Sequence, residues 1–202
     1  VAWPDWLSRL FVSAGPESMP ARLNAHQSRV IWQQVLDEVI RDPLVNIPGL
    51  SRHARDAWKN LHEWRVPVDE CIAAASSRDQ RLFASAASRY RARLAAENWI
   101  DDAMLGGTVT AAVEAGTLTL PERLWLAGFD RLTPEAHALI AALRERGTHV
   151  EQAPAGSSTD EAAVLACDDP DAELRTAGAW ARSQLDRNPD GRIGIVVSGL
   201  EQ

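Results

Sequence analysis

Residues 123–154, RLWLAGFDRLTPEAHALIAALRERGTHVEQAP, decide the fold that we expect for this chain. The apolar run Leu124–Ala127 is long enough for a buried strand and too short for a helix. Thr133-Pro134 starts a helix, because the hydroxyl caps free N–H groups and proline at the first helical position has no N–H to leave unpaired. Gly147 ends that helix, and Thr148–Val150 begin a second strand. This order predicts a parallel pair of strands with a right-handed crossover.

The residues before this unit predict helices. Asp5–Ser13 has the apolar spacing of a short amphipathic helix, so residues 1–21 are expected to form an N-terminal helix and a loop. Three longer helices are expected from Asn24 to Ile40, from Leu50 to Trp64 and from Ser77 to Glu97, and a further one from Asn98–Asp102 to Gly116. Residues 22–117 are thus expected to be an all-helical block.

The residues after the unit predict a second α/β segment. Ala162–Cys167 and Ile193–Val197 have the composition of buried strands, and Asp169-Pro170 starts a helix over Ala172–Leu185 between them. The expected fold is therefore α/β, with a mostly helical N-terminal block followed by parallel α/β segments.

Composition limits the classes of protein to consider. The net charge of -7 argues against a surface that binds nucleic acid all round, but leaves room for a local basic patch. Cys71 and Cys167 lie in apolar contexts, which predicts two buried free thiols in a reducing compartment. Without a membrane-length apolar run or a secretion leader, we expect a cytoplasmic protein with no membrane contact. Because the chain starts at Val1 without methionine and ends just after an expected strand, we expect it to be part of a larger protein.

A single lysine, Lys59, stands among the 21 basic residues and excludes two activities. A P-loop requires Gly-Lys-Ser/Thr, whereas Lys59 lies between Trp58 and Asn60. A nuclease of the Asp…Glu-x-Lys type requires a carboxylate two residues before the lysine, where this chain has Ala57. We therefore expect neither ATP hydrolysis at a Walker site nor that metal-dependent cleavage within these residues.

Other candidate sites have structural explanations. The acidic run Asp168–Glu173 resembles a metal site but is typical of a helix N-terminus, where carboxylates complement the helix dipole. The five histidines and two cysteines show no ligand spacing. The sequence therefore predicts no catalytic residue, no metal and no cofactor in this chain.

One helix carries a candidate nucleic-acid surface. At 100° per residue, one arc of the Ser77–Glu97 helix is basic and lies opposite the apolar face, with Arg78, Arg81, Arg89 and Arg93 on it. Such a face either follows a phosphate backbone or is a solvated helix surface, and the sequence leaves both possibilities open. The eight tryptophans could stack bases, but most fall at core-facing helix positions, which predicts packing.

LWLAGFDRLTPEAHALIAAL (124–143), followed by DDPDAELRTAGAWARSQLDRNPDGRIGIVVSGLEQ (168–202), resembles the AddB-type subunits of bacterial helicase–nucleases. More narrowly, it is similar to the "probable DNA repair protein" family of the Asp…Glu-x-Lys nuclease superfamily. The matching features are Gly128-Phe129, Thr133-Pro134, the helix from Glu173 to Leu185 and the apolar run Ile193–Val197.

The resemblance implies an interior fragment of a superfamily-one helicase-like core of the P-loop NTPase type. Residues 22–117 would be a 1B-like block, residues 118–160 the end of a 1A-like domain and residues 161–202 the start of a 2A-like domain. In active relatives the first strand ends in Asp-Glu, but here those positions are Ala127 and Gly128, which can neither hold magnesium nor act as a base. The resemblance thus implies a degenerate Walker B position, with DNA and an AddA-like helicase as partners of the parent protein.

Three functions remain as hypotheses. The first is a non-catalytic, DNA-binding or partner-docking part of a DNA-repair helicase–nuclease that acts on single-stranded or forked DNA. The second is a protein-interaction scaffold whose arginine face binds no nucleic acid. The third is a free-standing small-molecule enzyme, which would require a pocket with convergent polar groups.

Overall fold

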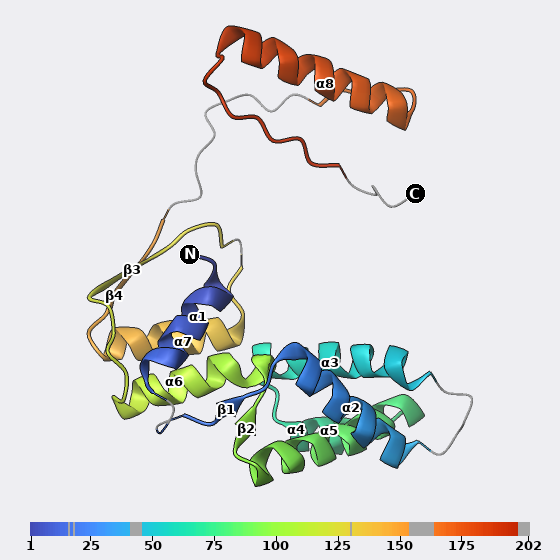
Figure 1. The fold of residues 1–202 in the computed structure, drawn as a ribbon, viewed down its shortest axis with the longest axis vertical. Coiled ribbons are helices and arrows are strands. Elements are labelled where there is room, and N and C mark those ends of the chain that lie inside the picture. The colour runs from blue at the N-terminus through green and yellow to red at the C-terminus, as the bar shows by residue number, and fades with distance from the viewer. Residues whose placement is uncertain (16, 18, 41–45, 130, 154–163, 198–202) are drawn as a thin grey trace. The chain divides into compact units, whose positions relative to one another are not determined.

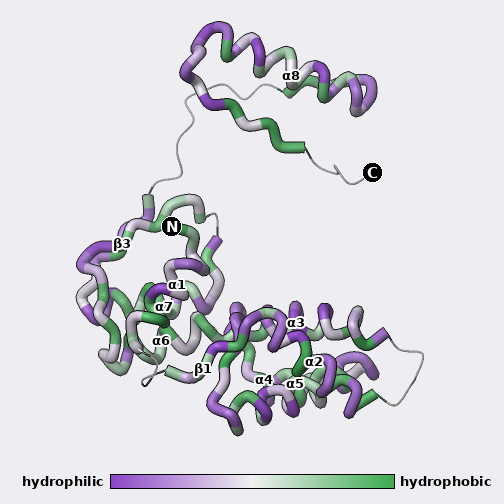
Figure 2. Tube along the Cα trace, in the orientation of Figure 1, coloured by the Kyte–Doolittle hydropathy of each residue, from purple (hydrophilic) through white to green (hydrophobic). Residues whose placement is uncertain are grey.

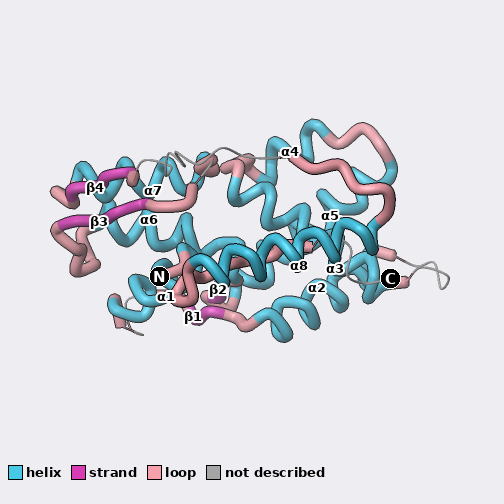
Figure 3. Tube along the Cα trace, turned by 90° about the horizontal axis from the view of Figure 1, so that it is seen from above, coloured by secondary structure: helices cyan, strands magenta, loops and turns pink. Residues whose placement is uncertain are grey.

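The computed structural model describes residues 1–15, 17, 19–40, 46–129, 131–153 and 164–197. The chain is a mixed α/β protein in which helices predominate and the described strands form two short parallel pairs (Figures 1 and 3). It divides into two compact units, Val1–Ala155 and Gly156–Gln202. The first unit contains α1 (Trp3–Ser13), β1 (Ala21–Arg22), α2 (Ala25–Val39), α3 (Ile47–Glu63), α4 (Val68–Ala74), α5 (Arg78–Ala96), β2 (Trp99–Ile100), the 3-10 helix η1 (Asp102–Met104), α6 (Leu105–Ala115), β3 (Arg123–Leu126), α7 (Pro134–Glu145) and β4 (His149–Gln152).

The strand–helix–strand unit predicted at residues 123–154 is confirmed. β3 and β4 pair in parallel, with Leu124 opposite Val150, and α7 connects them. The Thr133 hydroxyl accepts a hydrogen bond from the Ala136 N–H at 3.3 Å, as expected for the cap of α7. Gly147 follows the helix with φ +93°, a left-handed conformation that favours glycine.

One hydrophobic core surrounds this unit. The buried side chains of α7, among them Leu139 and Leu143, pack with Val109 and Val113 of α6 and with Leu7 of α1. Trp125 lies on the face of the β3–β4 pair that is turned away from this core, and it is 60% exposed.

A second core holds α2, α3 and α5 together. Its centre is aromatic: the rings of Trp32 and Tyr90 are stacked with centroids 4.2 Å apart, and Trp58 meets Tyr90 edge-on at 5.5 Å. The core position of Trp32 was not predicted. Among the described residues, Trp32 and Trp58 are the only tryptophans that are completely buried. Trp64, Trp125 and Trp180 are each more than half exposed.

Two helices of this second core, α2 and α5, begin as predicted, whereas α3 begins at Ile47, three residues before the expected Leu50. Asn24 caps α2, and its side chain and that of Gln27 satisfy each other's backbone N–H groups. Ser77 and Gln80 form the same reciprocal cap on α5. Each cap satisfies N–H groups that a helix leaves unpaired. The start of each of these helices could therefore be predicted from neighbouring residues alone.

The expectation that a helix begins at Asn98–Asp102 was wrong for Asn98–Ile100, whereas Asp101 caps η1, which leads into α6, and α6 ends before Gly116 as expected. Asn98 has φ +52°, which turns the chain after α5. Trp99 and Ile100 then form β2, paired in parallel with Ala21 and Arg22 of β1. The block expected to be all-helical therefore contains a short sheet.

The second unit contains α8 (Pro170–Arg187). The Asp169 side chain accepts a 2.6 Å hydrogen bond from the Ala172 N–H, so the acidic start of this helix is a cap, as predicted. The segment Ile193–Val197 is largely apolar (Figure 2), but the expected strand is not formed there. The described residues of this unit provide no paired strand, and Val196 is 98% exposed. Val164–Cys167 likewise form no strand, and the first residues of that prediction, Ala162 and Ala163, lie outside the described residues.

Two further expectations concern the cysteines and contact with a membrane. Cys71 and Cys167 are free, as predicted, but Cys71 is only half-buried and Cys167 is exposed, so the prediction of buried thiols was wrong. None of the helices among the described residues has both the length and the apolar character needed to span a membrane.

Candidate nucleic-acid interface on α5

The four predicted arginines lie on α5, but the structure places them in three different surroundings. Arg81 and Arg89 line one groove, Arg93 turns to α2, and Arg78 lines an apolar groove. The predicted basic face is therefore not uniform. Its parts differ in how much positive charge they leave for a ligand.

Arg81 and Arg89 line a groove of about 540 Å³ beside α4, which packs against α5 (Figure 1). The hydroxyl-bearing Ser85 and Ser88 lie between them along the helix, and the remaining described lining residues are apolar: Ile72, Ala75 and Ala84. We call this surface the Arg81–Arg89 groove. Guanidinium and hydroxyl groups are the donors that bind phosphate oxygens. No carboxylate is found among the described residues that line the groove.

Arg93 is engaged with α2. It donates hydrogen bonds to Oε1 of Glu38 at 2.7 Å and to Oε1 of Gln34 at 3.3 Å. Arg89 approaches the other Glu38 oxygen at 3.8 Å. One carboxylate thus lies between two guanidinium groups, so the Arg89–Glu38–Arg93 group keeps a net positive charge.

Arg91, which was not predicted as part of a site, faces α4. Its guanidinium donates two hydrogen bonds to the Asp69 carboxylate, at 2.7 and 3.1 Å. The bidentate contact holds the pKa of Asp69 below its usual value. This pair is a connection between α4 and α5 and is not available to a phosphate.

Arg78 lies at the start of α5, beside an apolar groove of about 500 Å³. Its walls come from α2, α3 and α5 and include Leu36, Leu50, Leu82 and Phe83. Such a groove fits apolar side chains better than a phosphate backbone.

Ala127 and Gly128 directly follow β3. Both are exposed, and Gly128 has φ +76°. Neither provides a ligand atom from its side chain, and the described residues contain no cluster of three or more His, Cys, Asp or Glu that could hold a metal ion. The neighbouring Asp130 lies outside the described residues.

A cavity of about 310 Å³ opens beside this loop, with Phe129 and Trp3 on one wall. The ring of Trp3 meets that of Phe129 edge-on at 5.7 Å. Opposite, the carboxylate of Glu135 covers the first turn of α6 and accepts a hydrogen bond from the Gly107 N–H. Burial raises the pKa of Glu135, and the Gly107 bond opposes this shift. The anion-binding end of α6 is thus already occupied by a side chain.

Asp101 is a buried carboxylate, only 4% exposed, which the sequence placed only as part of a helix start. Its carboxylate accepts hydrogen bonds from Tyr90 at 2.9 Å, from Trp58 at 3.3 Å, and from the backbone N–H groups of Ala103 and Met104. Burial and the Asp101 charge both raise the pKa of Tyr90. Because four donors satisfy the carboxylate, its role is to connect α3, α5 and η1.

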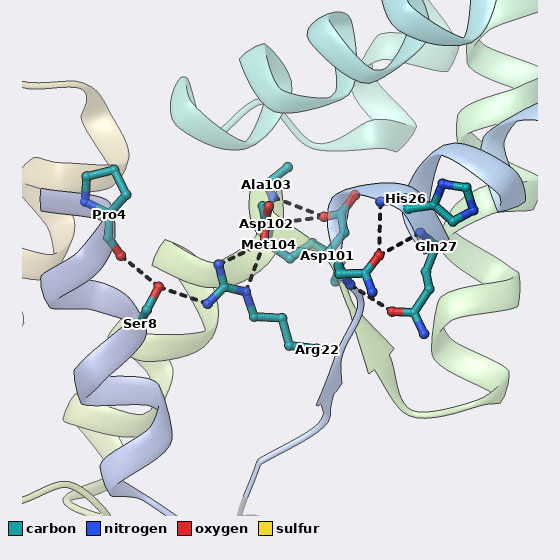
Figure 4. A network of polar contacts seen from close by, with 10 residues as sticks. Pro4, Ser8, Arg22, His26, Gln27, Asp101, Asp102, Ala103 and Met104 are labelled. Carbon is teal, nitrogen blue, oxygen red and sulfur yellow. Dashed lines mark hydrogen bonds and ion pairs between the residues drawn. The ribbon is translucent and has the colours of Figure 1, made fainter. Parts of the chain in front are cut away.

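Arg22 makes a similar connection on the surface (Figure 4). Its Nε donates to Oδ1 of Asp102 at 2.9 Å and its Nη1 to Oγ of Ser8 at 2.8 Å. Ser8 in turn donates to the carbonyl oxygen of Pro4. β1 is thereby attached to both α1 and η1.

In comparisons with known proteins, no family model and no curated protein matches this chain.

Proposed function

We propose that this chain is a non-catalytic part of a bacterial DNA-repair helicase–nuclease-like protein, and that the Arg81–Arg89 groove binds the phosphate backbone of single-stranded or forked DNA. In this proposal the chain needs no cofactor, and an AddA-like helicase is the partner of a parent protein that works in the cytoplasm. The observation that supports DNA binding is that the groove has two guanidinium groups and two hydroxyls, and no carboxylate among its described lining residues.

Two features support a role without catalysis. The loop after β3 has Ala127 and Gly128 in the positions where an active helicase has acids. The only lysine, Lys59, lies 3.5 Å from Glu63 on α3 and far in sequence from that loop. A scaffold that positions DNA requires neither group.

Salt dependence tests this proposal, because phosphate contacts release counterions. We expect the full chain to bind a fluorescent oligonucleotide with an affinity that falls steeply as salt rises. Arg81→Glu combined with Arg89→Glu should weaken binding at least tenfold and flatten the salt slope by about two, one for each lost contact. Anisotropy titrations at several salt concentrations measure both quantities.

The matched control is Arg9→Glu combined with Arg123→Glu, because it makes the same change in net charge at two exposed positions on α1 and β3. The control should keep the salt slope of the wild type. Equal losses in the two double variants would mean that only net charge matters, and the groove would lose its role.

The second candidate function is a protein-interaction scaffold. The apolar groove beside Arg78 favours it, since it offers about 500 Å³ lined largely by Leu, Ile, Ala and Phe side chains. The pairing of Arg91 and Arg93 with carboxylates favours it as well, because it removes part of the positive charge of α5. Absence of DNA binding even at low salt would favour this function over the first.

A further inference from the structure

A third groove, of about 730 Å³, adjoins the C-terminal end of α5. It is bordered by β1, β2 and α2, and Trp99 of β2 forms its aromatic wall. Ile31 contributes apolar floor, while Gln27, Gln34, Arg93 and Glu97 contribute polar groups. We call it the Trp99 groove.

The hydrogen bonds of the two glutamines determine what they present to a ligand. The Gln27 side-chain oxygen accepts from the Asn24 N–H at 2.8 Å, and the Gln34 oxygen accepts from Arg93 at 3.3 Å. Since both carbonyl oxygens are used within the protein, each amide has its NH₂ group as the donor for a ligand. Glu97 adds an acceptor.

An aromatic wall with amide donors and a carboxylate acceptor matches the chemistry of a nucleobase. A base is planar and stacks on an indole ring without regard to sequence, and its edge carries carbonyl oxygens and amino groups. The groove therefore offers a stacking surface together with partners for both kinds of edge group.

The two grooves lie along the same helix. Twelve residues separate Arg81 from Arg93, which corresponds to about 18 Å along the axis of α5. The Arg89–Glu38–Arg93 group connects them, because Arg89 lines the Arg81–Arg89 groove and Glu38 and Arg93 line the Trp99 groove. A strand of a few nucleotides could place its phosphates in one groove and a base in the other.

We infer that the Trp99 groove receives an unpaired base of the strand whose phosphates lie in the Arg81–Arg89 groove. This inference rests on the proposed function. It assigns the preference for single strands to Trp99, since a base within a duplex is already stacked and paired whereas its phosphates are accessible in either form.

The test compares three fluorescent ligands of equal length with the full chain: a poly-dT strand, the same strand with abasic positions, and a duplex. The wild type should bind the dT strand on the order of tenfold more tightly than the abasic strand, the size expected for stacking of one base. Trp99→Leu keeps an apolar side chain but lacks a π face, so it should bind the two strands equally. Trp99→Phe should restore most of the difference, and the duplex affinity and salt slope should not change in either variant.

Because Trp99 also packs against the second core, Gln34→Ala provides a variant at an exposed position. It should reduce binding of the dT strand several-fold and leave the abasic strand unaffected. If the wild type binds normal and abasic strands equally, or if Trp99→Leu preserves the difference, the inference is wrong while DNA binding at the arginines stands. If the wild type binds none of the ligands, the proposed function fails and the inference fails with it.

Discussion

The hydroxyl of Tyr90 on α5 donates a 2.9 Å hydrogen bond to Oδ2 of Asp101, at the start of η1. The same hydroxyl lies 2.9 Å from Oγ of Ser28 on α2. Tyr90 is fully buried and Asp101 and Ser28 nearly so. A line of polar groups therefore crosses the second core and connects α2 with α5 and η1.

Removal of one member of this line should destabilise the protein strongly. Tyr90→Phe removes the hydrogen-bond partner of Oδ2 of Asp101 and of the Ser28 hydroxyl, while Oδ1 of Asp101 keeps its three donors. The loss should cost about 1–3 kcal/mol of unfolding free energy. Asp101→Ala should cost more, because the cap of η1 is lost and Tyr90 and Trp58 both lose their acceptor. Urea unfolding measures both values. A Tyr90→Phe variant as stable as the wild type would show that the line contributes no stability.

The close approach of Glu135 to α6 makes Gly106 sensitive to any side chain. A methyl group at Gly106 would overlap the Glu135 carboxylate, whose Oε1 would lie only 2.7 Å away. Because the overlapping group is the end of a flexible side chain, Gly106→Ala should displace the Glu135 carboxylate and destabilise by only about 1 kcal/mol, the size of one lost hydrogen bond. Thermal unfolding of Gly106→Ala alone and with Glu135→Ala tests the cause, because the second substitution should restore most of the loss.

Gly107 provides the matched control on the same turn. A methyl group there would lie 4.0 Å from the nearest Glu135 atom, and alanine favours a helix interior more than glycine does. Gly107→Ala should therefore leave stability unchanged or raise it by up to about 1 kcal/mol. Equal losses at both glycines would contradict the overlap with Glu135.

Glu135 should also give the protein a pH dependence. Its pKa is raised by burial above the ordinary value of 4.5, so the folded state holds the proton more strongly than the unfolded state. Stability should then fall as pH rises from 4.5 through the raised pKa, and the loss should persist at neutral pH. Glu135→Gln keeps an acceptor for the Gly107 N–H without the charge, so it should be more stable than the wild type at pH 7 and equal to it below pH 4.5. A stability difference that is constant across this range would rule out the titration of Glu135.

His62 should act in the opposite direction. Burial lowers its pKa from 6.5, although the charge of Asp101 opposes the shift, and its Nε2 has no hydrogen-bond partner among the described residues. The unfolded state therefore binds the proton more strongly, and stability should be lost as pH falls below 6.5. His62→Phe retains an aromatic ring against Trp58 and should remove this loss. Chemical unfolding of both proteins between pH 7 and pH 5 compares their slopes, and parallel slopes would contradict the prediction.

Local signals in the sequence predicted much of the first unit. Thr133, Asn24 and Ser77 each satisfy N–H groups within three residues, and Gly147 turns the chain two residues after the end of α7. These features depend only on neighbouring residues, so the positions of α7, α2 and α5 could be read from the chain.

Contacts between distant residues could not be predicted in the same way. The pairing of Trp99 with Ala21, and the line from Ser28 to Asp101, join segments with no local signal for each other. The surroundings of the arginines of α5 also depend on residues that are distant in sequence. Helical spacing placed them on one arc, but Glu38 on α2 decides the surroundings of Arg93. The expected strand at Ile193–Val197 has the composition of a strand without a neighbouring strand among the described residues.

The register of β1 and β2 has a consequence for the evolution of the chain. Ala21 lies opposite Trp99 and Arg22 opposite Ile100, so the chain leaves the first core and returns to almost the same point, one strand spacing away. Residues 23–98 therefore form one segment whose two ends lie next to each other. A piece with this geometry can be lengthened, exchanged or deleted, and the gap closed by a short linker, without moving the elements that host it. The Arg81–Arg89 groove, which lies within these residues, would then be part of a detachable module, free to diverge while the host fold stays fixed.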